Sequence, residues 1–321
     1  MDRAGGYLPL DPIFLSEQLH RVSSWKTTRL LRRVLPQPLI ERLRDVKLRV
    51  LSSGLSRDRE WEQSLVDAES SAPMSIVVPI HDAPTVTRRC LASLEKFAPQ
   101  SEIILVDDAS KEVATLEVIS SFVNRNSWRV VRHEKALGHS GACKAGADLA
   151  TRPYLCLLNS DTVVTPWCWR LVEEVFERDP LTGVAGPSTS CTYNDQSSSY
   201  AYPLRHYWNE NQICGFAKRL LTDTTDPAVV DLPWVAGFAF FIRRNLWEQL
   251  GGFDPNLPDY GNEVELCKRI WAKGYRTVWI RKSYIHHLGS ESYRQTIGAE
   301  AIVARSQAAE IYTEQRHSTH S

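Results

Sequence analysis

The sequence lacks the features of a membrane-spanning or exported protein. Its longest apolar run, Trp234–Ile242, is half the length of the roughly 18 residues that a transmembrane helix needs. The first residues do not have the basic-then-apolar order of a signal peptide. We therefore expect a cytoplasmic protein.

Paired cysteines are also lacking. The seven cysteines are odd in number and scattered, and no two of them form a C-x-x-C pair. They are Cys90, Cys143, Cys156, Cys168, Cys191, Cys214 and Cys267. This pattern argues against a disulfide framework or a zinc site and favours reduced, buried thiols.

An excess of one charge is missing as well. The 321 residues include 38 Lys or Arg and 38 Asp or Glu, which argues against a basic protein that coats nucleic acid. With 43% hydrophobic residues, the chain has the composition of a globular protein and not of a disordered one. The charge is unevenly distributed, however. Eleven Lys or Arg but only three Asp or Glu lie between Glu17 and Glu60.

This basic segment, 17–60, is predicted to be helical. Leu39, Leu43, Val46 and Val50 have the spacing of one helix face. The helices either lie on an anionic membrane surface, at the inner face of the cell membrane, or pack on the body of the protein with a solvated basic face. We expect three regions: a helical basic extension (1–72), a catalytic domain (73–295), and a C-terminal helix and tail (296–321).

From residue 74 onward, short apolar runs alternate with helical patterns. Strands are expected at 74–80, 102–106, 128–132, 154–158, 234–242 and 276–280, and helices follow the first four strands and begin again near Asn262. Residues 188–228 are polar and are expected to form long loops, and residues 314–321 a frayed tail. The alternation predicts an α/β fold with a mostly parallel sheet flanked by helices.

Acidic residues follow two of the predicted strands. Ligands bind at the carboxyl ends of such sheets, where Pro79, Asp107, Asp108 and the stretch Asn159-Ser160-Asp161 fall. The aspartates could accept hydrogen bonds from a nucleoside or, at Asp161, bind a divalent cation that holds a diphosphate. Alternatively, they form turns or helix caps.

Three further features could take part in chemistry. Glu263 begins a helical pattern. It could act as a general base, or it could stabilise the helix through a favourable interaction with the helix dipole. His286 and His287 follow a strand, and one of them could be a second metal ligand. The turn from Gly138 to Gly141 precedes a helix whose N–H groups could receive a phosphate.

The order of these motifs is more specific than any one of them. Along the chain they read SIVVPIHDAP, EIILVDDAS, ALGHSGACKAG, YLCLLNSDTVV, GGFDPNLPDYGNEVELCKRIWAKGYR and YIHHLGSES. Over residues 74–293 this series resembles the family 2 glycosyltransferases with the GT-A fold, and it looks most like their rhamnosyltransferase-like branch. The resemblance implies an inverting enzyme that moves a sugar from a nucleotide diphospho-sugar to an acceptor hydroxyl, in the synthesis of bacterial surface glycans or glycoconjugates.

The resemblance also implies a role for each matching position. Glu263 would be the catalytic base, and Asp161 and His287 would hold Mg²⁺ or Mn²⁺. Trp234 and Gly237 would line the acceptor site. The donor site would be formed by Pro79, Asp107, Asp108, Gly138, Ser160 and Asp161. The acceptor would be a glycan, a lipid-linked sugar or a protein, and an oligomer is compatible with the sequence.

Some positions depart from the family pattern. Asn159 replaces the first acid of the D-x-D motif, Ala136 and Lys144 replace asparagines around the glycine turn, and Glu263 stands where aspartate is common. These departures leave open a catalytically impaired scaffold that binds nucleotide sugars or glycans. A sugar nucleotidyltransferase is a lesser alternative, because the stretch PIHDAP after the first strand is not the glycine-rich basic loop of that class.

Overall fold

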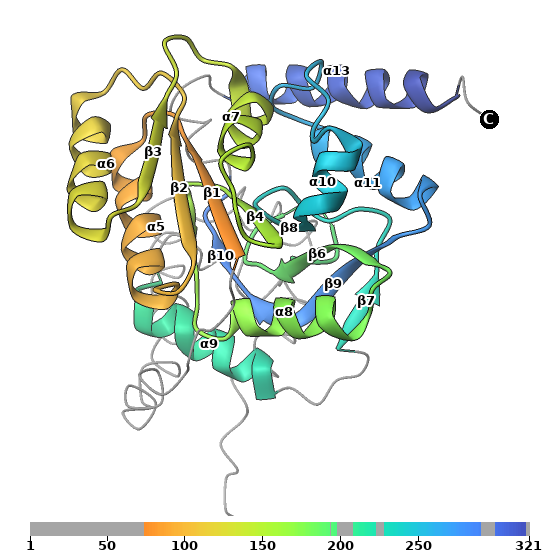
Figure 1. Cartoon of the computed structure of the whole chain (residues 1–321), viewed down its shortest axis with the longest axis horizontal. Helices are drawn as coiled ribbons and strands as arrows, with labels where there is room; N and C mark the ends of the chain where they lie inside the picture. Colours follow the sequence, from red (N-terminus) through yellow and green to blue (C-terminus); the bar gives the residue numbers. More distant parts are fainter. Residues whose placement is uncertain (1–73, 193, 198–207, 223–227, 290–298, 319–321) are drawn as a thin grey trace, which may run out of the picture.

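The computed structural model describes residues 74–192, 194–197, 208–222, 228–289 and 299–318. Its centre is an eight-stranded sheet with the strand order β3-β2-β1-β4-β8-β6-β9-β7 (Figure 1). The strands are β1 (Met74–Ile80), β2 (Glu102–Asp107), β3 (Arg129–Arg132), β4 (Tyr154–Leu158), β6 (Thr182–Ser188), β7 (Val229–Asp231), β8 (Ala239–Arg243) and β9 (Arg276–Tyr284). Only β7 and β8 run against the others, so the predicted α/β fold with a mostly parallel sheet is confirmed.

Helices cover both faces of this sheet. One face packs on α5 (Pro84–Phe97), α6 (Val113–Asn126) and α8 (Cys168–Arg178). The other packs on α7 (Gly138–Ala147), α10 (Arg244–Leu250) and α11 (Asn262–Ala272). Strand β1 shows why the core has two halves: Ile76 and Val78 point to the first face, and Val77 points to the second. Burial on both faces explains why β1 is apolar nearly throughout instead of alternating with polar residues.

The second half of the chain differs from the sequence prediction in three places. The apolar run Trp234–Ile242 is strand only at its end, in β8, and residues 234–238 lie outside any strand. The stretch 188–228 contains a helix, α9 (Glu210–Thr222), which buries Ile213 and Phe216 against Tyr284 of β9. The helix α13 (Ala299–Ser318) continues through most of the predicted tail.

Helix α7 lies unusually close to the sheet, at Gly146. A Cβ built there would be 2.2 Å from Val77 Cγ1 and 3.1 Å from Val106 Cγ2. We expect Gly146→Ala to destabilise the protein by about 1–3 kcal/mol, because overpacking a core costs more than the ~1 kcal/mol that alanine gains in helix propensity. Urea unfolding measures this difference. Lys144→Ala, on the exposed side of α7, is the matched control and should stay within about 0.5 kcal/mol of the parent.

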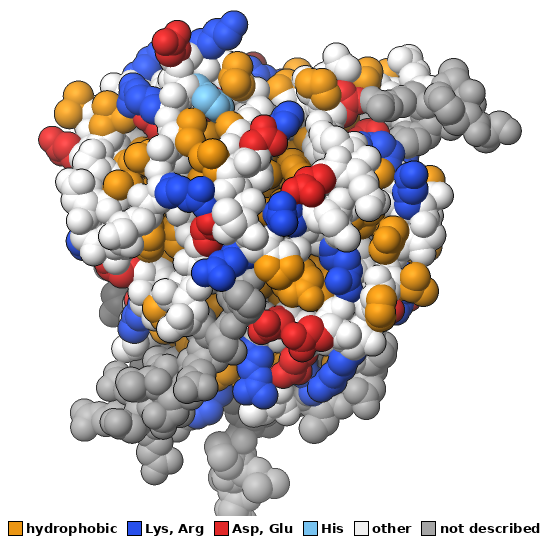
Figure 2. Space-filling view, viewed as in Figure 1, with side chains coloured by type: hydrophobic (Ala, Val, Ile, Leu, Met, Phe, Trp, Pro, Cys, Tyr) orange, Lys and Arg blue, Asp and Glu red, His pale blue; other side chains and the backbone are white. Residues whose placement is uncertain are grey.

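Two expectations about the periphery have different outcomes. The N-terminal region 1–72 and its proposed membrane contact through residues 17–60 lie outside the described residues. Among the helices that are described, none combines the length and the apolar character needed to cross a membrane. On the face shown in Figure 2, charged side chains of both signs are interspersed, in keeping with the balanced composition.

Candidate active site

A pocket of about 410 Å³ lies at the carboxyl ends of β1 and β4, within the size range of small-molecule sites. Its walls are contributed by the ends of these strands, the start of α7, the 254–260 loop and α13. The lining residues are Pro79, Ile80, His81, Asp108, Ala136, Leu137, Gly138, His139, Ala142, Asn159, Ser160, Pro258, Asp259 and Arg305. Four predicted donor-site residues, Pro79, Asp108, Gly138 and Ser160, are therefore brought together.

The two neighbouring aspartates after β2 have different surroundings. Asp107, the last residue of β2, accepts a hydrogen bond from the Ser110 N–H and pairs with Arg132 at 2.5 Å, and it is absent from the pocket lining. Asp108 lines the pocket and accepts bonds from the backbone N–H groups of Leu137 and Gly138 at 2.8 and 2.9 Å. Successive side chains of an extended backbone point to opposite sides, so the two aspartates face different surroundings. The sequence alone does not say which of the two faces the pocket.

The N-terminus of α7 is already satisfied by the protein itself. Asp108 accepts from Gly138 N–H, as stated above, and the Pro258 carbonyl accepts from Ser140 N–H at 2.8 Å. The 254–260 loop approaches so closely that a Cβ on Gly138, whose φ is +75°, would lie 2.9 Å from Pro258 O. A phosphate could bind these N–H groups only by displacing Asp108 or that loop. The helix-terminus phosphate interpretation is therefore not supported at this turn.

A second, two-stranded sheet joins the two predicted metal ligands. Strand β5 (Thr162–Val163) pairs antiparallel with β10 (His286–His287), and His287 lies opposite Thr162. This pairing places His287 Nε2 3.3 Å from Asp161 Oδ1. His286 points to the other side, where its Nδ1 is 2.8 Å from the Tyr284 hydroxyl and its ring stacks on Trp208. Strand alternation thus decides which of the two histidines faces Asp161.

The chemistry of this pair fits a divalent cation. His287 Nδ1 lies 2.7 Å from the Cys191 carbonyl oxygen, which can only accept, so Nδ1 carries hydrogen and, in the neutral ring, Nε2 is the nitrogen that can bind a metal. Two ligands at right angles around one Mg²⁺ or Mn²⁺ would be about 3 Å apart, given metal–ligand distances of about 2.1 Å. Among the described residues, no group of three or more His, Cys, Asp or Glu side chains could hold a metal. Water or phosphate oxygens would complete the coordination, as is usual for Mg²⁺.

Glu263 lies in the first turn of α11 with its carboxylate against Gly237. A Cβ on Gly237 would be 3.6 Å from Glu263 Cδ, an ordinary van der Waals distance, so the carboxylate packs directly on the Gly237 backbone. Burial raises the pKa of Glu263, and hydrogen bonds from its own backbone N–H and from that of Gly237 lower the pKa by a smaller amount. A carboxyl group with a raised pKa is suited to general-base catalysis near neutral pH.

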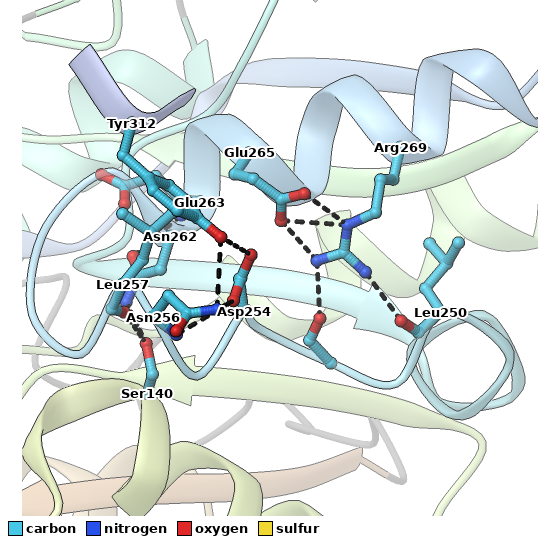
Figure 3. A network of polar contacts seen from close by, with 11 residues as sticks. Ser140, Leu250, Asp254, Asn256, Leu257, Asn262, Glu263, Glu265, Arg269 and Tyr312 are labelled. Atoms are coloured by element: carbon cyan, nitrogen blue, oxygen red, sulfur yellow. Dashed lines mark hydrogen bonds and ion pairs between the residues drawn. The ribbon is translucent and has the colours of Figure 1, made fainter. Parts of the chain in front are cut away.

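A polar network fixes the start of α11 (Figure 3). Asn262 is 1% exposed, and its amide donates to Ser140 Oγ at 2.8 Å while its oxygen accepts from Glu263 N–H. One turn further on, the fully buried Glu265 pairs with Arg269, which also donates to the carbonyls of Leu250 and Gly252. These bonds tie Glu263 to the wall of the pocket through α7 and to the end of α10.

The remaining predictions concern the acceptor side. Trp234 is partly buried, and its carbonyl accepts from the Asn194 side chain at 3.3 Å; it does not line the pocket. The pocket also includes residues that the sequence reasoning missed, namely His81, His139, Asp259 and Arg305. No motif points to His139, because what distinguishes it is its burial in the folded protein, which lowers its pKa. Arg305 carries no motif at all.

The chain matches the sequence profile described as glycosyl transferase family 2 over residues 75–248, more than half of its length. The protein belongs to this family, as the motif order predicted. The rhamnosyltransferase-like branch is not singled out, since the relatives found include polypeptide N-acetylgalactosaminyltransferases.

Two curated relatives and one solved structure illustrate the similarity. Polypeptide N-acetylgalactosaminyltransferase 8 of Drosophila melanogaster is 27% identical over 72% of this chain and 40% of its own length. The O-antigen biosynthesis protein RfbC of Myxococcus xanthus is 27% identical over 71% of this chain and 18% of its own. The crystal structure of GalNAc-T7 with UDP, GalNAc and Mn²⁺ has a TM-score of 0.53 and 21% identity, covering 68% of this chain and 44% of that one, and supports the fold. The chain therefore spans two fifths or less of these two curated relatives.

Proposed function

We propose that the protein is an inverting glycosyltransferase that uses a nucleotide diphospho-sugar donor and an acceptor hydroxyl. The observation that supports this most is that a pocket of about 410 Å³ lies beside the Asp161–His287 pair, Asp161 being the residue that follows the pocket residue Ser160 in the chain. Relatives whose names state sugar transfer, in protein glycosylation and in O-antigen synthesis, point to the same class of reaction. They also favour a protein or a glycan as the acceptor.

In the proposed reaction, the nucleoside part of the donor occupies the pocket beside Pro79 and Asp108, and the diphosphate extends toward Ser160 and Asp161. Glu263 accepts the proton of the acceptor hydroxyl, whose oxygen bonds to the anomeric carbon. The bond from that carbon to the nucleoside diphosphate breaks on the opposite face, which inverts the configuration. Mg²⁺ or Mn²⁺ bound at Asp161 and His287 would supply positive charge at the leaving diphosphate.

A donor panel tests the proposal. Thermal shift and calorimetric titration of the full chain with UDP-, dTDP- and GDP-sugars, with and without Mn²⁺, should reveal metal-dependent binding of one nucleotide class. UDP-GalNAc and dTDP-rhamnose are the informative members, because they separate the relatives named above from the rhamnosyltransferase-like branch. Binding without product formation over a broad acceptor set would favour the scaffold, and no binding by any nucleotide would overturn the proposal.

The pH profile provides an independent check on Glu263. The base must be ionised to accept a proton, so kcat/KM is expected to fall as the pH falls through the pKa of Glu263. Because burial raises that pKa, the acidic limb should lie above about pH 4.3, the ordinary value for glutamate. Initial rates from pH 4 to pH 9 at saturating metal measure the limb. A limb at or below the ordinary value would contradict the assignment.

A further inference from the structure

The electrostatic balance of the pocket does not match the anionic ligand proposed for it. Its described lining contains two carboxylates, Asp108 and Asp259, and a single Lys or Arg side chain, Arg305. Asp108 is held by two backbone N–H groups, as described above, and by His133 Nδ1 at 2.7 Å. Asp259 forms an ion pair with Arg305. A diphosphate entering this pocket would thus meet one Lys or Arg side chain of the described lining, and that side chain is already paired.

Arg305 is brought to the pocket by the C-terminal helix, which docks on the loop that precedes Glu263. Ala309 is buried against Gly261, where a Cβ on the glycine would lie 3.0 Å from the alanine Cβ. Tyr312 donates to Asp254 Oδ2 at 3.1 Å and contacts Asn256 at 3.2 Å (Figure 3). Positions 305, 309 and 312 follow the i, i+4, i+7 spacing of one helix face. The docking therefore holds the base of the Arg305 side chain beside the pocket.

The ion pair itself is suited to exchange. The Asp259 side chain is 8% exposed, with Oδ1 3.5 Å from the His139 backbone nitrogen, whereas the Arg305 side chain is 49% exposed. A half-exposed pair of this kind contributes little to stability. A guanidinium group binds phosphate oxygens through two parallel hydrogen bonds, so a phosphate group can replace Asp259 as the partner of Arg305.

We propose that Arg305 is a phosphate-binding residue of the donor pocket and that Asp259 holds it in place until the nucleotide binds. This assignment rests on the proposed function and adds a residue, and a C-terminal helix, to the donor site. When the diphosphate enters, Arg305 leaves Asp259 and binds the phosphate oxygens. Asp259 thereby acts as a competitor that weakens nucleotide binding while it keeps the arginine oriented.

The experiment compares ligands that differ only in phosphate. The full chain is titrated by calorimetry, in the presence of Mn²⁺, with a nucleoside, its monophosphate and its diphosphate. The base of these ligands is the one that the donor panel identifies. The variants are Arg305→Ala, Arg305→Lys and Asp259→Asn. Arg170→Ala is the matched control, because Arg170 forms an exposed ion pair with Glu174 on α8, outside the pocket lining.

We expect Arg305→Ala to weaken the diphosphate by about 10- to 100-fold, the range for a hydrogen bond to a charged group, and to leave the nucleoside within about 2-fold. Arg305→Lys should fall in between, because lysine keeps the charge but not the two-pronged geometry. Asp259→Asn should tighten diphosphate binding, whereas a purely structural ion pair would give losses of the same sign for Arg305→Ala and Asp259→Asn.

Equal diphosphate affinity in Arg305→Ala and the parent would overturn the assignment, and so would an equal loss for nucleoside and diphosphate. Either result would be seen in the variants while the parent protein still binds the nucleotide. Failure of the proposed function has a different signature, because the parent protein would then bind no nucleotide at all, and the assignment of Arg305 would fall with it.

Discussion

Glu263→Gln is expected to lower kcat by about 10²- to 10⁴-fold while nucleotide binding stays unchanged. The amide has nearly the shape of the carboxylate and can still accept from the Gly237 N–H, but it cannot take up the acceptor's proton. Rates of sugar transfer and calorimetric nucleotide affinities, measured on the same preparations, separate the two effects. Glu248→Gln, an exposed carboxylate on α10 paired with Arg244, is the matched control and should transfer normally.

The same variant should not lose stability. The pKa of Glu263 is raised in the folded protein, so its favourable contribution is present at low pH and is lost as the pH rises through that pKa. Glutamine removes this loss. We therefore expect a Tm equal to or above that of the parent at pH 7, with the difference shrinking toward pH 4. Transfer at more than a tenth of the parental rate, or a Tm well below it, would contradict the role assigned to Glu263.

Asp161→Asn is expected to reduce kcat/KM by about 10²- to 10³-fold and to abolish the effect of Mn²⁺ on nucleotide binding. The loss is expected because Asp161 Oδ1 and His287 Nε2, which lie 3.3 Å apart, are the two proposed metal ligands. Asparagine removes the negative charge that would hold a cation near the diphosphate. Titration of Mn²⁺ in the presence of the nucleoside diphosphate measures it directly.

Two further variants sharpen this result. His287→Ala should also weaken Mn²⁺ binding, whereas Asp148→Asn, an exposed aspartate at the end of α7, should bind the metal as the parent does. Asparagine preserves the size of the buried Asp161 side chain, so the fold should survive. Unchanged Mn²⁺ affinity in Asp161→Asn would contradict the assignment of Asp161 as a metal ligand.

The regular part of the fold could be predicted because its signals are local. Buried runs such as Met74–Ile80 and Tyr154–Leu158, each followed by a helical pattern, determine parallel units with their ligands at the strand ends. The second half gave weaker signals. Helix α9 was missed because its apolar residues, Ile213 and Phe216, sit in a polar segment and are stabilised by contact with Tyr284, about seventy residues further along the chain.

The candidate site was predictable where chemistry is carried by a motif. The aspartates and the histidine pair stand out in the sequence because they follow predicted strands, and Glu263 stands out because it begins a helical pattern. Their partners do not stand out. Asn262, which ties α11 to Ser140, and Gly237, whose backbone N–H donates to the Glu263 carboxylate, acquire their roles only through neighbours more than twenty residues away.

The sequence by itself determined the alternation of strands and helices, the family, and the set of acids at the mouth of the sheet, since side-chain periodicity and local order encode all three. Tertiary structure alone decided that Asp108 and not Asp107 faces the pocket, that His287 and not His286 faces Asp161, and that Arg305 of α13 lines the pocket. Each of these depends on strand pairing and helix docking between distant segments, because those contacts set the direction in which a side chain points.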